Sequence, residues 1–181
     1  MRRFGGCIST ILLCCVIAGI YGILYNQFTY TISPEYYSLH LFREYNTDPA
    51  EYGSERLAAA VVGFKSSWGT GLLIGCGLSL TCFIFDSSQE MRKYRWPAIL
   101  IVLATTALMG FAGYSLSDAE LEQQGVDRYL VNELANPVEY INVRTIDRYS
   151  AVGACLGLLL ASSFLFTQKA KANLLLAKFA T

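Results

Sequence analysis

Residues 57–85, LAAAVVGFKSSWGTGLLIGCGLSLTCFIF, decide the fold class of this chain. The stretch holds one charged residue, Lys65, and exceeds the roughly 20 residues that a helix needs to cross about 30 Å of hydrocarbon. Three other stretches are similarly apolar and none alternates like a barrel strand, so the sequence predicts an all-α, polytopic membrane protein with a four-transmembrane-helix bundle. The predicted single membrane domain, residues 1–181, has spans at 4–25, 57–85, 97–115 and 150–167, and short helical outer loops at 26–56 and 116–149.

The composition excludes several classes of protein. Hydrophobic residues make up 54% of the chain and charged residues 15%, whereas a soluble domain carries about 25% charged residues. The formal net charge of zero leaves no basic face for nucleic acid. The many aromatic and aliphatic side chains are the opposite of a disordered composition. The chain is therefore expected to have the lipid bilayer as its solvent.

Basic residues near the span ends predict the orientation. One side would hold Arg2, Arg3, Arg92, Lys93, Arg95, Lys169, Lys171 and Lys178 against the acidic residues Asp86 and Glu90. The other would hold Arg43, Arg56, Arg128, Arg144 and Arg148 against the remaining acidic residues. Both termini are therefore expected in the cytoplasm. No small-x-small cleavage site follows the first span, so that span is expected to be an uncleaved anchor rather than a secretory signal.

Small residues recur at every fourth position in two spans. At this spacing they form a ridge on which a neighbouring helix backbone can pack closely in lipid. We expect both ridges at helix interfaces, within one chain or between copies, which makes a homo-oligomer or another membrane subunit the expected partner. The ridge residues are Ala59, Gly63, Ser67, Gly71, Gly75 and Ser79 in the second span and Gly153, Gly157 and Ala161 in the fourth.

No residue pattern indicates catalysis, a cofactor or a metal site, so we expect a protein that is not an enzyme. All six cysteines fall within predicted spans, none in a CxxC arrangement, and are expected to be small buried thiols. Lys65 is predicted to point away from the small-residue ridge and His40 to pack among aromatic residues. In the alternative, functional interpretation, Lys65 and His40 contact a lipid headgroup or a ligand.

Three helix starts are predicted in the outer loops. A capping serine and proline open a helix in residues 33–35, and residues 48–51 repeat that pattern ahead of the second span. Ser117 and Glu120 form a capping box, which predicts a helix from there to about Leu134. These loops also carry most of the acidic residues, which form either a solvated surface or a cation-attracting vestibule.

Two segments resemble a known group of proteins. Residues 30–37, YTISPEYY, follow the first span, and residues 56–63, RLAAAVVG, open the second. In this respect the chain resembles bacterial four-span integral membrane proteins of uncharacterised function, which implies a bacterial inner membrane and no transferable activity. Those proteins have a histidine before the last span, whereas residues 149–153 have none.

The leading functional hypothesis is a non-enzymatic scaffold or accessory subunit that acts through helix–helix association. The alternative is a small passive channel or transporter formed by an oligomer. Active transport is disfavoured, because ion coupling usually needs an intramembrane carboxylate and the predicted spans have none. A membrane enzyme acting on lipid through His40 and Lys65 ranks last. The residues predicted to line a channel are Ser66, Ser67, Thr70, Thr105 and Thr106.

Overall fold

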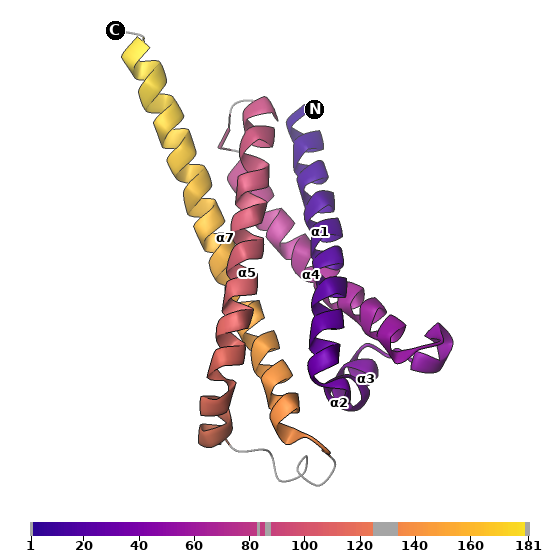
Figure 1. The fold of residues 1–181 in the computed structure, drawn as a ribbon. Coiled ribbons are helices and arrows are strands. Elements are labelled where there is room, and N and C mark those ends of the chain that lie inside the picture. Colours follow the sequence, from indigo (N-terminus) through magenta and orange to yellow (C-terminus); the bar gives the residue numbers. More distant parts are fainter. Residues whose placement is uncertain (1, 83, 86–87, 125–133, 180–181) are drawn as a thin grey trace.

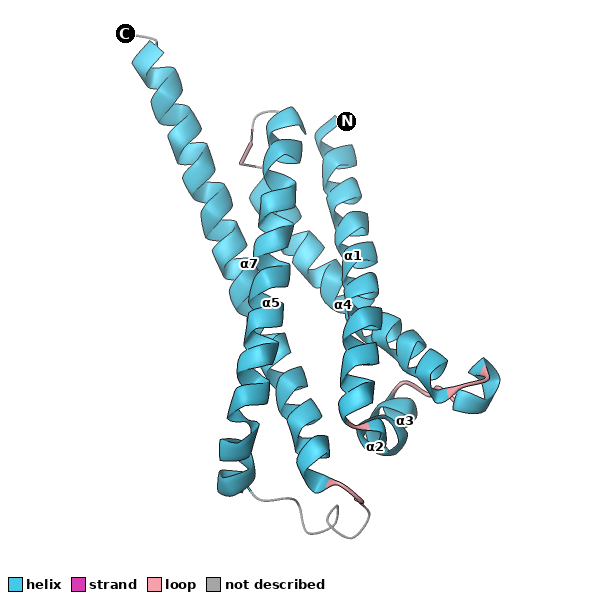
Figure 2. Ribbon diagram, in the orientation of Figure 1, coloured by secondary structure: helices cyan, strands magenta, loops and turns pink. Residues whose placement is uncertain are grey.

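A computed structural model describes residues 2–82, 84–85, 88–124 and 134–179, and in these ranges the chain is helical with no strand. The predicted all-α class is confirmed, and four of the described helices are long and apolar enough to cross a membrane. By this criterion the chain is an integral membrane protein. The elements are α1 (Arg2–Ile32), α2 (Pro34–Tyr36), the π-helical turn η1 (Tyr37–Leu41), α3 (Phe42–Glu44), the 3-10 turn η2 (Pro49–Tyr52), α4 (Glu55–Cys82), α5 (Ser88–Gln124) and α7 (Pro137–Phe179) (Figure 2).

The four long helices form two antiparallel hairpins. Helix α1 packs along α4, and α5 packs along α7, whereas contacts between the two pairs are sparse. Figure 1 shows both termini at one end of the bundle, called here the terminal end, and α2 and α3 at the other, called the loop end. The bundle is therefore two tight helix pairs joined loosely to each other.

Small residues allow the close approach within the first hairpin. A Cβ on Gly71 would lie 2.6 Å from the Ala18 Cβ, and a Cβ on Gly75 would lie 2.8 Å from the Ile11 Cα. Polar contacts flank these positions, because the Ser79 hydroxyl donates to a buried carbonyl oxygen of α1, at 3.2 Å. The ridge of α4 is thus the surface on which α1 packs.

The shorter ridge of α7 packs against α5 in the same way. A Cβ on Gly153 would lie 2.8 Å from the Thr105 carbonyl oxygen, and one on Gly157 would lie 2.8 Å from the Val102 Cα. Ala161, one turn further, is fully buried. Both ridges therefore make their contacts inside a single chain.

Two apolar clusters stabilise the bundle at different levels. The terminal-end cluster draws on all four long helices, whereas the loop-end cluster joins α1, α4 and the short helices to the start of α7. The buried residues of the terminal-end cluster are Cys7, Cys14, Leu78, Phe85, Met91, Ala98, Ile99, Val102, Ala161 and Leu165. Those of the loop-end cluster are Tyr30, Tyr36, Tyr37, Phe42, Ala58, Ala59, Val62, Leu134, Tyr140 and Val143.

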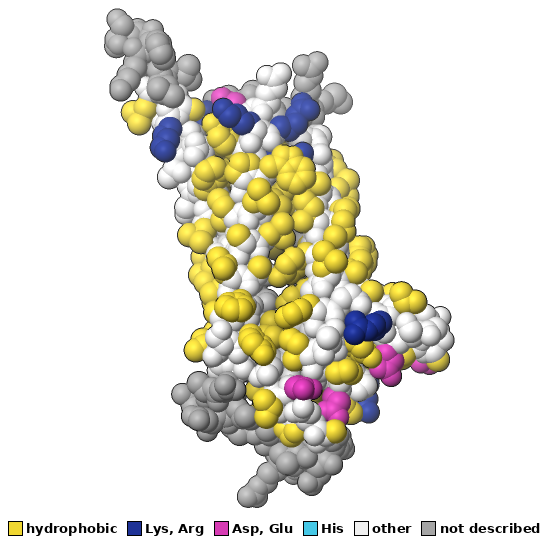
Figure 3. All heavy atoms as spheres, viewed as in Figure 1, with side chains coloured by type: hydrophobic (Ala, Val, Ile, Leu, Met, Phe, Trp, Pro, Cys, Tyr) yellow, Lys and Arg dark blue, Asp and Glu magenta, His cyan; other side chains and the backbone are white. Residues whose placement is uncertain are grey.

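The surface divides into three zones along the bundle (Figure 3). Hydrophobic side chains cover a broad band between the ends, Lys and Arg gather at the terminal end, and Asp and Glu predominate at the loop end. Leu73 and Leu108 are examples of large apolar side chains on the outside of the band. Such a band suits contact with lipid rather than with water.

Two of the three predicted helix starts are found in the structure. The Ser33 hydroxyl accepts the N–H of Tyr36, and the Asp48 carboxylate accepts the N–H of Ala50 at 2.9 Å. The turn that Asp48 opens ends at Gly53, whose φ of 73° breaks the helix before α4 begins.

The third predicted start was wrong. Ser117 lies inside α5, where its hydroxyl donates back to the Tyr114 carbonyl oxygen at 2.7 Å, so it caps no new helix. The apolar third span continues smoothly into the polar segment that follows, and this continuity outweighs the local capping signal. Residues 125–133, about half of the helix predicted up to Leu134, lie outside the described residues.

Candidate functional site

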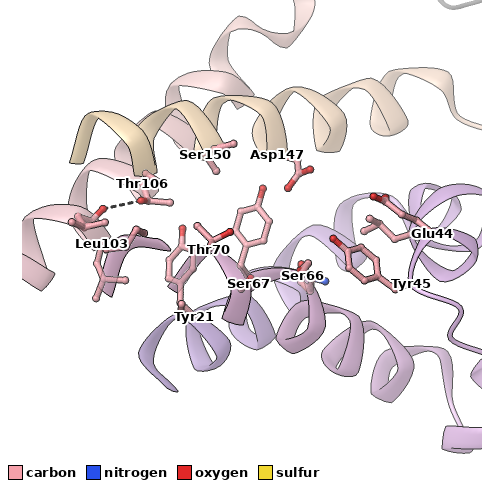
Figure 4. A pocket seen from close by; sticks show the side chains of 18 residues that line it. Tyr21, Glu44, Tyr45, Ser66, Ser67, Thr70, Leu103, Thr106, Asp147 and Ser150 are labelled. Atoms are coloured by element: carbon pink, nitrogen blue, oxygen red, sulfur yellow. Dashed lines mark hydrogen bonds between the residues drawn. The ribbon is translucent and has the colours of Figure 1, made fainter. Parts of the chain in front are cut away.

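A cavity of about 270 Å³, lined by both polar and apolar side chains, lies between the two hairpins (Figure 4). All four long helices and the α3 region contribute to its wall, so it exists only where the hairpins meet. The wall consists of Ala18, Tyr21, Tyr25 and Asn26 of α1; Leu41, Glu44 and Tyr45; Ser66, Ser67, Thr70 and Ile74 of α4; Val102, Leu103 and Thr106 of α5; and Asp147, Ser150, Ala151 and Ala154 of α7.

Hydroxyl side chains from two facing helices line the middle of the cavity. Four of the five residues predicted to line a channel, Ser66, Ser67, Thr70 and Thr106, are brought together here within one chain. Thr105 is not among them, because it lies in the close contact between α5 and α7, opposite Gly153 and Gly157. The polar surface predicted for an oligomer is therefore assembled by a monomer.

Two of these hydroxyls face the cavity as acceptors. Ser66 donates to the Gly63 carbonyl oxygen at 3.2 Å, and Thr106 donates to the Val102 carbonyl oxygen at 2.8 Å. A hydroxyl has one proton and two lone pairs, so these oxygens have lone pairs left for a ligand.

Two buried hydroxyls, one from each hairpin, lack a hydrogen-bond partner. They belong to Tyr25 and Ser150, which both line the cavity, and Ser150 is only 8% exposed. The two groups lie close to each other without forming a hydrogen bond of acceptable geometry. Buried polar atoms are rarely left unpaired in folded proteins, so this pair indicates a place for a polar partner.

Two carboxylates lie at the loop end of the cavity. Asp147 points into it from α7, and Glu44 approaches from α3. Glu44 lies 3.5 Å from the exposed imidazole of His40, whereas Asp147 has neither a hydrogen-bond nor an ion-pair partner among the described residues. No described Lys, Arg or His side chain lines the cavity.

The segment containing α2 and α3 covers the loop end of the cavity. The Lys65 ammonium group donates to the Thr47 hydroxyl at 3.0 Å and to the Tyr45 carbonyl oxygen at 3.4 Å. Lys65 therefore holds this segment onto α4, a role that sequence reasoning missed. His40, the other predicted contact residue, is half exposed and lies over the Tyr36 ring.

The same segment also reaches the second hairpin. The Glu35 carboxylate accepts the backbone N–H groups of Ala135 and Asn136, at 3.0 and 3.2 Å, just before α7 begins. The rings of Tyr36 and Tyr140 meet edge to face, with centroids 5.2 Å apart. Burial raises the pKa of the Tyr36 phenol well above its usual value, since a phenolate would lose its hydration there.

The cavity ends on packed apolar side chains toward the terminal end. Ile74, Val102 and Leu103 form this floor, and all three belong to the terminal-end cluster or pack against it. The cavity is thus closed toward the terminal end and does not form a continuous pore.

A second, mostly apolar groove of about 550 Å³ runs between α1 and α5. It shares Tyr21, Tyr25 and Ser150 with the cavity, so these three side chains separate the two spaces. Ile146 faces the groove while its neighbour Asp147 faces the cavity.

The described part of the chain contains no cluster of three or more His, Cys, Asp or Glu side chains that could hold a metal ion. Among the described residues, Cys7, Cys14, Cys15, Cys76 and Cys155 form no disulfide. Cys7 and Cys14 are buried within the terminal-end cluster, but Cys76 and Cys155 are exposed, so the prediction that all six cysteines are buried was wrong. That the protein is not an enzyme and has no cofactor stays a prediction.

Comparison of the chain with family models, with curated proteins and with solved structures finds no match.

Proposed function

We propose that this chain is a non-enzymatic membrane transporter that takes a small polar solute into the cavity between its hairpins. The observation that carries the proposal is the cavity itself: hydroxyls and carboxylates from both hairpins converge inside an apolar bundle. Polar side chains at membrane depth are costly and mark substrate pathways. Solute sites of small transporters similarly lie between two halves of the bundle.

A scaffold that associates through its small-residue ridges has less support. The ridges of α4 and α7 are covered by α1 and α5 within the same chain. A scaffold would therefore need another face to bind its partner. The apolar band is such a face, but its composition already suits contact with lipid. A passive channel also has less support, because the terminal-end cluster closes the cavity on one side.

The arrangement of the helices suits movement of two halves. Packing is close within each hairpin and sparse between them, so each pair can move as a unit around the shared cavity. Rocking of such units would expose the cavity alternately at each side of the membrane.

The proposed orientation follows from the charges at the two ends. Lys and Arg at the terminal end support, by the positive-inside rule, a cytoplasmic position for both termini and an outward-facing loop end. The resemblance of residues 30–37 and 56–63 to bacterial four-span proteins supports a bacterial inner membrane.

Cysteine labelling tests whether the cavity holds water. Thr70→Cys places a thiol in the cavity, and Leu73→Cys places one on the lipid-facing side of the same helix. A charged, membrane-impermeant thiosulfonate reagent added from the loop side should modify the first variant and leave the second at the level of wild type. Equal labelling of both variants would contradict the proposal.

Liposome flux tests transport directly. Reconstituted wild type should speed the entry of at least one of three probes, glycerol, urea and methylammonium, over protein-free liposomes. Thr70→Trp, which fills the cavity, should abolish that increase, and Leu73→Trp should preserve it. A wild type that moves no probe, or a flux untouched by Thr70→Trp, would overturn the proposal.

A further inference from the structure

We infer that the cavity between the hairpins selects a small organic ammonium ion, with the Asp147 carboxylate as its counter-ion. The inference rests on the proposed function and names the class of solute that the site takes. Three independent observations support it: the charge of the wall, the direction of its hydrogen-bonding groups, and the unpaired hydroxyls beside Asp147.

The charges of the wall favour a cation. The two carboxylates near the loop end repel each other, and the described lining has no cationic side chain to offset them. Glu44 has His40 beside it, but Asp147 faces the cavity without an ion-pair partner. A cation that enters would relieve this repulsion where water is partly excluded, and electrostatic attraction is stronger there than in bulk solvent.

The hydrogen-bonding groups favour a solute that donates. The hydroxyls of Ser66 and Thr106 donate to backbone carbonyl oxygens, so they present only lone pairs to the cavity. Asn26 uses one of its two amide N–H groups on the Ala59 carbonyl oxygen, at 3.2 Å, and its own side-chain oxygen can accept. An ammonium group has donors and no acceptor, which matches such a wall.

The unpaired hydroxyls indicate where the ammonium group of the solute binds. Ser150 lies on α7 one turn from Asp147, is more than nine-tenths buried, and has no hydrogen-bond partner. The hydroxyl of Tyr25 is unpaired beside it. Both oxygens can accept from a donor held at Asp147, which would satisfy two buried groups that the protein alone leaves unsatisfied.

The aromatic part of the wall favours an organic cation over a metal ion. Tyr21, Tyr25 and Tyr45 line the cavity, and tyrosine rings attract ammonium groups while also packing against carbon. A Ca²⁺ ion is usually held by several carboxylates, and the described residues contain no cluster of three or more His, Cys, Asp or Glu side chains. A volume of about 270 Å³ limits the solute to a small molecule.

The test compares two probes of the same shape. Isobutylammonium carries a positive charge and isobutanol does not, and their binding to the purified full-length chain in nanodiscs can be measured by calorimetry. Wild type should bind isobutylammonium at least tenfold more tightly than isobutanol. Asp147→Asn should lose at least tenfold in affinity for the cation, while Glu51→Gln, which removes an exposed carboxylate that does not line the cavity, should stay within twofold of wild type.

Ser150→Ala gives a second measurement. It should weaken the binding of isobutylammonium while the preference over isobutanol remains, because the carboxylate is still present. Equal binding of both probes, or unchanged cation binding in Asp147→Asn, would overturn the inference. In that event labelling of Thr70→Cys would still support the proposed function, and its absence would overturn both.

Discussion

Gly22 of α1 and Gly63 of α4 meet backbone against backbone where the two helices cross. A Cβ on either residue would collide with the carbonyl oxygen of the other. Neither helix can yield at this point without separating from the other, because the obstacle is main chain and not a flexible side chain. The first hairpin therefore depends on the absence of side chains at its crossing.

This dependence predicts a difference between two matched glycine substitutions. Gly63→Ala should lower the free energy of unfolding by about 1–3 kcal/mol, the usual cost of forcing extra atoms into a packed interface. Gly69→Ala on the same helix meets nothing within 4 Å and should be neutral or slightly stabilising. Thermal unfolding in detergent, followed by circular dichroism, measures both. Equal losses in the two variants would mean that the crossing is looser than described.

The orientation of the chain leads to a second prediction. Ala50→Cys lies at the loop end and Lys171→Cys at the terminal end, and both positions are exposed. In sealed membrane vesicles an impermeant maleimide should label only one of the two, and inverting the vesicles should exchange them. Labelling of both from the same side would refute the proposed topology.

The contacts of Lys65 predict a looser loop end when they are removed. Hydrogen bonds to charged groups contribute about 1.5–3 kcal/mol each, so Lys65→Met, which removes two of them, should open the segment around Tyr45 and Thr47 about a hundredfold more often. Limited trypsin digestion after the exposed Arg43 measures this opening. Lys93→Met, which removes an exposed cation at the terminal end, is the control and should leave the cleavage rate unchanged.

Burial of Tyr36 predicts how stability depends on alkaline pH. Burial raises the pKa of its phenol in the folded state, whereas the unfolded chain releases the proton near pH 10. Stability is therefore fully present below about pH 10 and falls as the pH rises further, because the unfolded state then binds fewer protons. Thermal midpoints measured between pH 8 and pH 11 should fall less steeply in Tyr36→Phe. An identical slope in this variant would refute the assignment.

The sequence predicts much of the fold because its strongest signals are local. Apolar length marks the spans, and the period of four in Gly63, Gly71 and Gly75 marks a surface that fits a close helix neighbour. Which helix each ridge meets depends on the arrangement of the whole bundle. The periodicity alone left packing within one chain and packing between copies open.

The candidate site was harder to predict, since its residues are distant in sequence. Asp147 was assigned to an outer loop, yet α7 extends upstream of the apolar span and turns its carboxylate into the cavity. A signal for this extension was present: Tyr140, Val143 and Ile146 continue the apolar stripe of the helix at intervals of three. The contact of Glu35 with Ala135 has no comparable signal in the neighbouring sequence, so it could not be predicted.

That contact also has a consequence for the order in which the protein is assembled. The acceptor for the N–H groups of Ala135 and Asn136 lies about a hundred residues earlier, on Glu35. The first hairpin can pack as soon as α4 has left the ribosome, because its contacts lie entirely within the first part of the chain. The start of α7 is synthesised later and finds its carboxylate already in place, so the finished half of the protein serves as the template on which the second half closes.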